Sequence, residues 1–405
     1  MKRITSCRVC KSRKIKEFLD LGDQPYANAL LKSPNDKEKF YPLSLSYCEN
    51  CSLVQLNHTP DPKELFSNYV WVTATSSTAR KHAKVFCKEI TSRLKNNKKG
   101  YILEVASNDG TFLLPFIKKG YTVLGIDPAK NIVETAIAAG VPTRCEFFGV
   151  SSVKRILKDM GPARVVFARN VLPHVADTHD FIKGMHAVLA DNGMLVIEIH
   201  YAKKIYQELH YDSVYHEHLC YFTIKSLEKL LSAYNLFIED ITTSPISGGS
   251  LVIYIRKKKI KESAKVVAYR KAEVRIKLNM LTSWKNFAKR VRRHKESLLE
   301  ILQKNKGKII VGYGASARSS TLLNYCGIRT KHIAVIADQN SWKQGLYTAG
   351  SHISIKSPDN VMKRNPHFVV ILAWNFKNEI MKILKDTYKY KGKLILPLPN
   401  NPKVL

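Results

Sequence analysis

Short apolar runs that end in small or acidic residues recur through the middle of the chain. Tyr101–Val105 is such a run, and it is followed by the small-residue turn Ala-Ser-Asn-Asp-Gly and by a helical repeat of apolar positions from Phe112. Tyr121–Asp127 is a second run, which finishes on a carboxylate. A strand, a turn, a helix and a second strand ending in Asp predict the first half of a doubly wound sheet, whose ligand lies at the carboxyl ends of the strands.

Three later apolar runs extend the predicted sheet: Ala163–Asn170, Met194–His200 and Ser250–Ile255. The last third of the chain repeats the pattern. Lys308–Arg318 is a strand that enters a G-x-G-x-x-A loop, and His332–Asp338 is a second strand that ends on Asp. Taken alone, this loop is also compatible with an NAD-binding domain. The pattern therefore predicts two Rossmann-like α/β units in one chain.

A basic segment separates the two units. Residues 256–296 hold 16 Lys or Arg against three acidic residues. Their apolar positions repeat near the helical period, at Val267, Val274, Leu278, Leu281, Trp284, Ala288 and Val291. We expect one or two amphipathic helices with a solvated basic face; a membrane-surface or nucleic-acid role is the alternative.

Charge is the unusual feature of the composition. The 66 Lys and Arg outnumber the 33 Asp and Glu, which gives a formal net charge of +33 over 405 residues. Such a field attracts nucleic acid, anionic membranes or phosphorylated small molecules. No uncharged apolar stretch reaches the ~18 to 20 residues of a membrane span, and no apolar core of a signal peptide follows the first residues. We therefore expect a cytoplasmic protein whose cysteines are thiols or metal ligands.

Four of the eight cysteines form two tight pairs, Cys7 with Cys10 and Cys48 with Cys51. A two-residue gap lets both thiolates of a pair bind one ion, and two such pairs complete a closed tetrahedral zinc site. The competing interpretation is two redox pairs, but neither pair follows a strand and precedes a helix as a thioredoxin-like motif requires. The spacing predicts structural zinc.

The first turn of the central unit favours S-adenosylmethionine over a dinucleotide. It lacks G-x-G-x-x-G, and its strand contains Glu104. A sulfonium donor has no pyrophosphate that would need a glycine-rich cradle. The pattern therefore predicts a methyltransferase, with another type of doubly wound domain as the alternative.

Tyr211–Phe222 concentrates three tyrosines, two histidines and two carboxylates in twelve residues. A metal site at His216 and His218 would need a different spacing, and a solvated loop without a role is the second alternative. We favour a site of proton transfer, because the pKa values of His, Tyr and Glu lie on both sides of neutrality.

Together, the Cys pairs, the E-V-A-S-N-D-G turn, Asn170–His174, Y-H-E-H and G-Y-G-A-S-A-R resemble the sugar 3-C-methyltransferases. These enzymes make branched deoxysugars from nucleotide-linked 4-keto sugars. The resemblance implies an N-terminal zinc-binding module, a central Rossmann-like S-adenosylmethionine domain and a C-terminal Rossmann-like domain, with the sugar nucleotide between the last two. The expected segments are residues 1–66, 67–255, a basic helical bridge at 256–304, and 305–405.

The resemblance also implies site residues. Its Tyr-x-Glu-His motif and its active-site His give the expected catalytic group Tyr215, Glu217, His218 and His174. The expected cofactor contacts are Glu104, Ser107, Asn108, Gly110, Asp127 and Asn170. The pyrophosphate of the substrate is expected at Gly312, Gly314, Ser316, Arg318 and Lys343.

Two positions depart from the family. Its usual Gly in the first turn is Ala106 here, which fits only where the backbone needs no positive φ. An aromatic stretch that often ends in Tyr reads Tyr69-Val-Trp71, and Trp transfers no proton, so a role for that Tyr moves to Tyr69 or disappears.

The acidity of the substrate suggests the mechanism. On this resemblance we expect neutral His218 to remove the C3 proton, and the enolate to take the methyl group from S-adenosylmethionine. Glu217 or Tyr215 orients the imidazole, while His174 or Tyr215 donates to the oxyanion.

Two other functions remain open. One is an RNA, DNA or small-molecule O- or N-methyltransferase with a zinc module, and the other is a non-catalytic sugar-nucleotide binder. Because the chain lacks an N/D-P-P-Y motif, nucleic acid is the runner-up, and most of the surplus charge is assigned to general composition. The sequence leaves the oligomeric state open.

Overall fold

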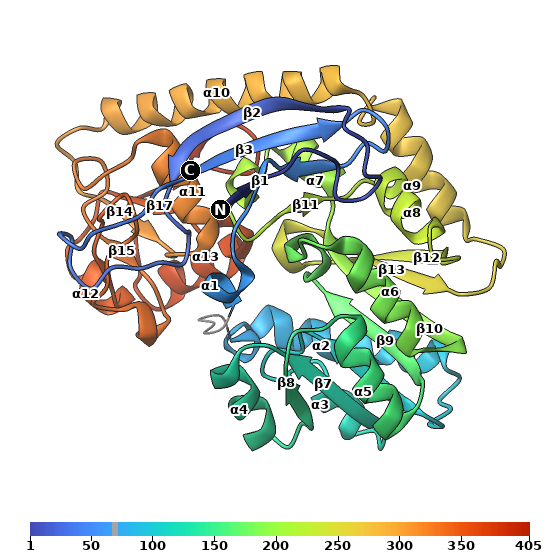
Figure 1. Ribbon diagram of the computed structural model, residues 1–405. Helices are drawn as coiled ribbons and strands as arrows, with labels where there is room; N and C mark the ends of the chain where they lie inside the picture. The colour runs from blue at the N-terminus through green and yellow to red at the C-terminus, as the bar shows by residue number, and fades with distance from the viewer. Residues whose placement is uncertain (67–71) are drawn as a thin grey trace.

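The computed structural model describes residues 1–66 and 72–405 (Figure 1). Tyr69 and Trp71 of the aromatic stretch lie outside the described residues. Across the described part of the chain, no helix combines the length and the apolar character that crossing a membrane requires.

The central sheet has seven strands in the order β12-β13-β10-β9-β6-β7-β8. The five strands from β10 to β8 are parallel, and β13 runs antiparallel to both of its neighbours. The order reverses between β6 and β9, which is where open α/β sheets bind ligands. The strands are β6 (Tyr101–Val105), β7 (Thr122–Asp127), β8 (Thr143–Cys145), β9 (Ala163–Arg169), β10 (Leu189–His200), β12 (Phe237–Ser244) and β13 (Ser250–Arg256).

Helices cover both faces of this sheet, so the strands at its centre are largely buried and mostly apolar. Val166 packs in the same core as Phe181 of α6, whereas the next residue, Phe167, packs with Phe86 of α2 on the opposite face. The predicted α/β class is confirmed. The helices are α2 (Ser77–Arg93), α3 (Leu114–Ile117), α4 (Lys130–Ala138), α5 (Val150–Met160), α6 (Thr178–Val188), α7 (Ala202–Glu208) and α8 (Ile224–Ser232).

The C-terminal sheet repeats the switch of strand order. Its six strands follow the order β16-β15-β14-β17-β18-β19, all parallel except β19, and the reversal lies between β14 and β17. The strands are β14 (Ile310–Tyr313), β15 (Ile336–Ala337), β16 (Ile355–Lys356), β17 (Phe368–Ile371), β18 (Lys393–Leu396) and β19 (Lys403–Val404). The helices are α11 (Ala317–Cys326), α12 (Pro358–Met362) and α13 (Lys377–Asp386).

The N-terminal sheet contains a strand from the middle of the chain. Its order is β11-β4-β3-β2, where β2 is Ile15–Gln24, β3 is Tyr41–Cys48 and β4 is Val54–Leu56. The fourth strand, β11 (Cys220–Tyr221), follows directly after the Y-H-E-H motif. The motif is therefore fixed to the N-terminal module as well as to the central sheet. The remaining short elements are β1 (Lys2–Arg3), paired with β5 (His58–Thr59), and α1 (Pro62–Phe66).

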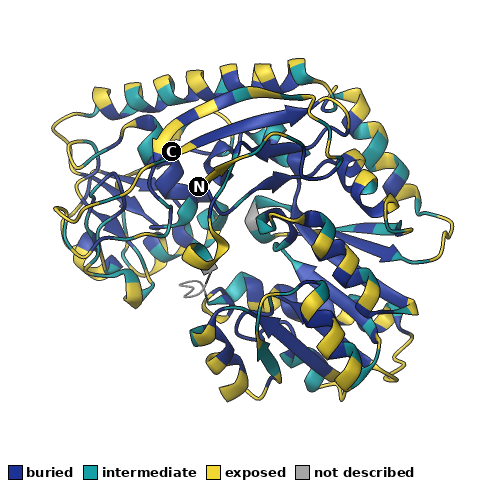
Figure 2. Cartoon of the chain, in the orientation of Figure 1, coloured by how far each residue is buried: buried dark blue, intermediate teal, exposed yellow. Residues whose placement is uncertain are grey.

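Two helices form the basic bridge, α9 (Ala264–Arg275) and α10 (Leu281–Lys304). Helix α10 runs along β2, and Figure 2 shows that its outward face is exposed. Trp284, Ala288 and Val291 face inward as predicted, but Val274 of α9 is 69% exposed. The inward position next to it belongs to Glu273, which accepts hydrogen bonds from the Tyr201 hydroxyl and the Ile224 backbone. A buried glutamate with these partners therefore replaces the predicted apolar contact.

Candidate active site

A cavity of about 560 Å³ lies between the two switch points of strand order. Its walls include the turns after β6 and β9 of the central sheet, the loop after β14, and the loop after β17. Asn28 of the N-terminal module also lines it. All three parts of the chain therefore contribute to one cavity.

The cavity brings most of the predicted site residues together. All four expected catalytic residues line it. From the expected cofactor group Asn108, Asp127 and Asn170 line it, and from the expected substrate group Ser316, Arg318 and Lys343 do so. The remaining five predicted residues, Glu104, Ser107, Gly110, Gly312 and Gly314, lie behind its wall.

Asp127 and Asn108 shape the turn of the central sheet. Asp127 accepts hydrogen bonds from the backbone N–H groups of Asn108 (3.0 Å) and Ala129 (2.9 Å). The side-chain oxygen of Asn108 accepts from the backbone and the hydroxyl of Thr73. Gly110 packs against Val141, where a Cβ would lie 2.6 Å from Cγ2. Gly110 therefore serves packing in this structure.

Glu104 reaches the cavity only through Arg169, which sequence reasoning missed. Glu104 is fully buried, and its carboxylate accepts a hydrogen bond from Nε of Arg169 at 3.1 Å. Burial raises the pKa of Glu104 to about 8, and the Arg169 charge opposes this shift. Arg169 itself lines the cavity and also lies 3.9 Å from Glu198. Arg169 could have been recognised from its place at the end of a predicted strand, directly before Asn170.

Ala106 does not meet the condition set from the sequence. Its φ is +53°, so the backbone of this turn lies in the left-handed region after all. Asn108 and Asn170 also have positive φ, but Asn tolerates this region through local hydrogen bonds. Ala106 therefore carries a strain that the family's usual Gly avoids.

We expect Ala106→Gly to raise the midpoint of thermal unfolding. Relief of the strained left-handed conformation should raise the free energy of unfolding by about 1–2 kcal/mol. The greater conformational freedom of Gly in the unfolded chain should lower that free energy by about 0.5–1 kcal/mol. Ala138→Gly, at an exposed helical position with ordinary φ, is the control and should lower the midpoint. Calorimetry measures both; a midpoint that falls for Ala106→Gly would contradict the strain.

Tyr215 and His218 form a directly bonded pair. The hydroxyl of Tyr215 lies 2.8 Å from Nε2 of His218, and Nδ1 of His218 lies 2.8 Å from the Ser213 carbonyl oxygen. A carbonyl only accepts, so Nδ1 carries the hydrogen and Nε2 of the neutral ring keeps its lone pair. Burial lowers the pKa of His218 well below its usual value, and nearby His174 adds to this. The ring is therefore neutral at physiological pH.

His174 stands beside this pair. The rings of His174 and His218 meet edge to face with centroids 4.7 Å apart. The backbone N–H of Leu219 donates to the Pro173 carbonyl at 2.7 Å, which ties the two segments together. Burial lowers the pKa of His174 to about 4. Two neutral imidazoles therefore face the same cavity.

Glu217 points to a different partner from the one expected. Among the described contacts it does not bond His218; its Oε1 accepts from the side-chain N–H of Asn28 at 2.6 Å. Burial raises the pKa of Glu217 to about 7, and the bond from Asn28 opposes this shift. Asn28 lies in a loop 189 residues away in sequence, so no local pattern pointed to it.

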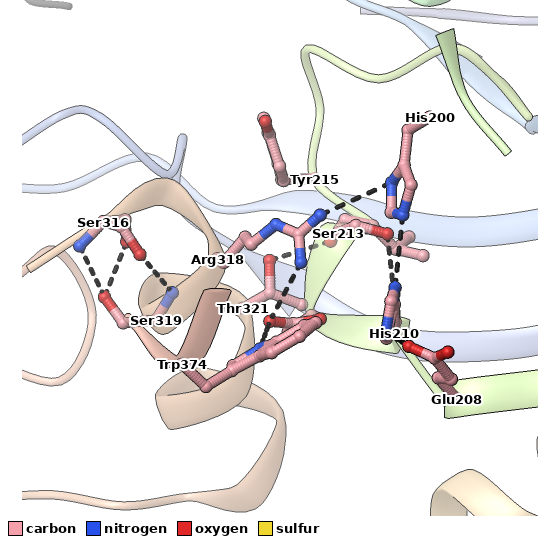
Figure 3. A network of polar contacts seen from close by, with 12 residues as sticks. His200, Glu208, His210, Ser213, Tyr215, Ser316, Arg318, Ser319, Thr321 and Trp374 are labelled. Carbon is pink, nitrogen blue, oxygen red and sulfur yellow. Dashed lines mark hydrogen bonds and ion pairs between the residues drawn. The ribbon is translucent and has the colours of Figure 1, made fainter. Parts of the chain in front are cut away.

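The C-terminal domain holds the catalytic segment from the other side. Thr321 donates to the Val214 carbonyl at 2.8 Å, and the indole of Trp374 donates to Asp212 at 2.6 Å. Figure 3 shows these contacts around Arg318. The segment 211–222 is therefore almost entirely buried, which excludes the solvated-loop interpretation.

The glycine loop supports the cavity wall with its glycines and lines the cavity with Ser316, and Lys343 of a later turn lines it beside that loop. A Cβ on Gly312 would lie 2.7 Å from Leu372, and one on Gly314 would clash with Ala373. Both glycines therefore permit close strand packing. Ser316 caps α11, and Nζ of Lys343 donates to the Ala315 carbonyl at 2.7 Å. An ammonium group is thus fixed at the start of a helix.

The four paired cysteines form one cluster. Their Sγ atoms all lie within 4.8 Å of one another, and Cys7–Cys51 and Cys10–Cys48 are each 3.5 Å apart. Four thiolates around zinc, at about 2.3 Å from the ion, stand about 3.8 Å apart. The cluster therefore fits a structural zinc ion with four cysteine ligands.

Comparison with known proteins decides the family. The chain is 30% identical over 408 residues to C-methyltransferase NovU of Streptomyces niveus, covering 99% of this chain and 97% of that protein. The chain belongs to the C-methyltransferase family. Family models match it as a zinc binding domain at residues 7–66, a methyltransferase domain at 79–240 and a C-methyltransferase C-terminal domain at 245–399. It is an S-adenosylmethionine-dependent C-methyltransferase with a zinc-binding module.

Other known methyltransferases resemble only part of this chain. Ubiquinone biosynthesis O-methyltransferase of Caulobacter sp. (strain K31) is 24% identical over 98 residues, 24% of this chain and 39% of that protein. The plantazolicin methyltransferase BpumL matches 46% of this chain and 87% of its own, at 15% identity and a TM-score of 0.35. Magnesium protoporphyrin IX methyltransferase of Synechocystis PCC 6803 matches 47% of this chain and 86% of its own, at 14% identity and a TM-score of 0.34.

The part of the cavity at the switch point of the central sheet fits S-adenosylmethionine in this C-methyltransferase. Asp127 offers a carboxylate for ribose hydroxyls, and Ile126 and Phe148 offer an apolar wall for adenine. The buried Oδ1 of Asn170 has no hydrogen-bond partner among the described residues, and it lies on a residue that lines the cavity. When bound, S-adenosylmethionine supplies an electrophilic methyl group.

Proposed function

We propose that this enzyme methylates C3 of a nucleotide-linked 4-keto-deoxysugar in branched-sugar biosynthesis. The observation that carries the proposal is the neutral His218, which keeps a lone pair on Nε2 and lines a cavity shared by the methyltransferase sheet and a second Rossmann-like sheet. A carbon next to a ketone loses its proton only weakly, so the reaction needs a base that is unprotonated at neutral pH. The expected cytoplasmic location stays a prediction.

The two halves of the cavity support the two halves of the substrate set. Asn108, Asp127 and Asn170 lie at the switch point of the central sheet, where we propose the methyl donor. Ser316 and Lys343 lie at the start of α11 on the opposite wall, where we propose the pyrophosphate. Backbone N–H groups at a helix start together with an ammonium group suit that anion.

In the proposed reaction Nε2 of His218 takes the C3 proton. Ser213 holds the ring in the required tautomer through its carbonyl, so the lone pair stays on Nε2. The Tyr215 hydroxyl occupies Nε2 at 2.8 Å in the free enzyme and must turn away when the substrate binds. That hydroxyl is then available to donate to the sugar, next to His174.

The test is incubation with methyl-labelled S-adenosylmethionine and a panel of dTDP- and GDP-linked 4-keto-6-deoxy sugars. Mass spectrometry should find one added methyl group on one of these sugars. A second reaction in deuterium oxide without the methyl donor should exchange the C3 hydrogen. Label transfer to RNA or to a hydroxyl oxygen, with none to carbon, would contradict the proposal.

We expect kcat/KM to rise with pH through about 7 and Glu217→Gln to remove that rise. Glu217 lines the cavity, and burial raises its pKa to about 7, whereas burial lowers the pKa of His174 to about 4. Glu104, whose pKa burial raises to about 8, does not line the cavity. The ionised form of Glu217 accepts from Asn28 and is free to accept from a sugar hydroxyl, and protonation weakens both bonds.

The pH profile of the variant is the measurement, and the wild-type profile is the reference. Gln keeps the size and one acceptor oxygen, so the variant should retain a flat activity between pH 6 and 8. A rise near pH 7 that persists in Glu217→Gln would assign it to another group.

A further inference from the structure

Arg318 reaches from the C-terminal domain to the catalytic segment. It is the second residue of α11, only 8% exposed, and it lines the cavity. Its Nη2 lies 3.4 Å from Nδ1 of His200, at the end of β10, and its Nη1 lies 3.9 Å from the Asp212 carboxylate. The guanidinium group is therefore anchored on residues of the central domain, whereas the Lys343 ammonium is held by the Ala315 carbonyl of the C-terminal domain.

A chain of hydrogen bonds fixes this position (Figure 3). Guanidinium only donates, so Nδ1 of His200 accepts and its Nε2 donates to Nδ1 of His210 at 3.2 Å. Nε2 of His210 then donates to the Glu208 carboxylate at 3.2 Å. Burial lowers the pKa of both histidines, so both rings are neutral and the direction of the chain is set.

The positive charge of Arg318 acts on the reactive pair. Burial and the Glu217 charge raise the pKa of Tyr215, and the Arg318 charge opposes them. Burial and His174 lower the pKa of His218, and the Arg318 charge adds to that effect. Figure 3 shows Arg318 between Tyr215 and Trp374, whose ring centroid lies 5.2 Å from the guanidinium carbon. The cation therefore stands close enough to Tyr215 and His218 to act on both of them.

We propose that Arg318 is a catalytic residue that pairs with the 4-keto oxygen and stabilises the enolate. This deepens the proposed function and rests on it. The C3 proton goes to Nε2 of His218, the C–H electron pair becomes the C3–C4 double bond, and the carbonyl π pair moves to the oxygen, whose negative charge meets Arg318. The C3–C4 pair then forms the carbon–methyl bond, the carbonyl is restored, and the electron pair of the broken S–methyl bond stays on sulfur, which becomes a thioether.

The experiment separates this role from a pyrophosphate contact. Arg318→Gln and Arg318→Lys are compared with Lys343→Gln, and with Arg364→Gln as an exposed control in the same domain. Calorimetry measures binding of thymidine diphosphate, which lacks the keto sugar. Deuterium exchange at C3 of the accepted dTDP-4-keto sugar, without methyl donor, measures enolate formation.

Arg318→Gln should slow C3 exchange and kcat about 10²–10³-fold, as loss of an oxyanion donor does, and Arg318→Lys less. Both variants should bind thymidine diphosphate within about twofold of wild type, and that binding also verifies their fold. Lys343→Gln should weaken the binding of thymidine diphosphate. If the Arg318 variants lose thymidine diphosphate affinity but keep the exchange rate, Arg318 is a phosphate ligand and the inference is wrong. If the wild type exchanges no C3 hydrogen with any sugar of the panel, the proposed function itself fails, and the inference with it.

Discussion

Replacing His218 with alanine should lower turnover about 10²–10⁴-fold, because general-base catalysis of this size is lost with the imidazole. The effect should fall on kcat, since Asp127, Asn170 and Ser316 still line the binding walls. Exchange of the C3 hydrogen in deuterium oxide should stop at the same time. Steady-state kinetics and mass spectrometry measure the two effects separately.

His186→Gln is the matched control for this result. His186 lies on α6, is half-buried and does not line the cavity, so activity should stay near that of the wild type. Tyr215→Phe adds a finer comparison, because it removes the hydroxyl on Nε2 and keeps the base. Full C3 exchange in His218→Ala would transfer the role of base to another group, with Glu217 the next candidate.

Loss of the zinc ion should inactivate the enzyme although no cysteine of the cluster lines the cavity. Structural zinc supplies folding free energy directly, so Cys51→Ser or a strong chelator should unfold the N-terminal module. That module holds Asn28 against Glu217, and its strand β4 pairs with β11 directly after His218. Turnover should therefore fall more than the affinity for S-adenosylmethionine.

Cys145→Ser controls for the loss of a thiol, because Cys145 is exposed and outside the cluster. Inductively coupled plasma mass spectrometry measures bound zinc, and circular dichroism measures the β-strand content. One zinc per chain in the wild type and the Cys145 variant, and less in the Cys51 variant, is expected. Full activity in a protein freed of zinc would show that the module does not position the catalytic segment.

Local patterns predicted a strand well where it is buried on both faces, as β6 is. Tyr101–Val105 and Tyr121–Asp127 were recognisable from a few neighbouring residues, and the structure has strands there. The same reasoning failed at Val274, since helical period alone does not tell which of two adjacent positions faces inward. Glu273 occupies that position because two distant donors, Tyr201 and Ile224, satisfy its carboxylate.

The candidate site divides in the same way. Motif spacing identified Tyr215 and His218, which bond each other across a three-residue turn. It did not identify Asn28 or the chain through His200, His210 and Glu208. The Asn28 contact joins two modules that lie 189 residues apart in sequence. His200, His210 and Glu208 lie in one short segment of the central domain, and the fold of that segment aligns their side chains.

The sequence by itself determined the two α/β units and the four zinc-binding cysteines, because strand patterns and C-x-x-C pairs are local. The catalytic motif came from the family resemblance and stays a prediction. Only the tertiary structure decided that both switch points open into one cavity and that Ala106 carries a positive φ. It also decided that Arg318 faces His200 and Asp212. These features arise where segments far apart in sequence pack together, and their geometry is set by the surfaces that meet there.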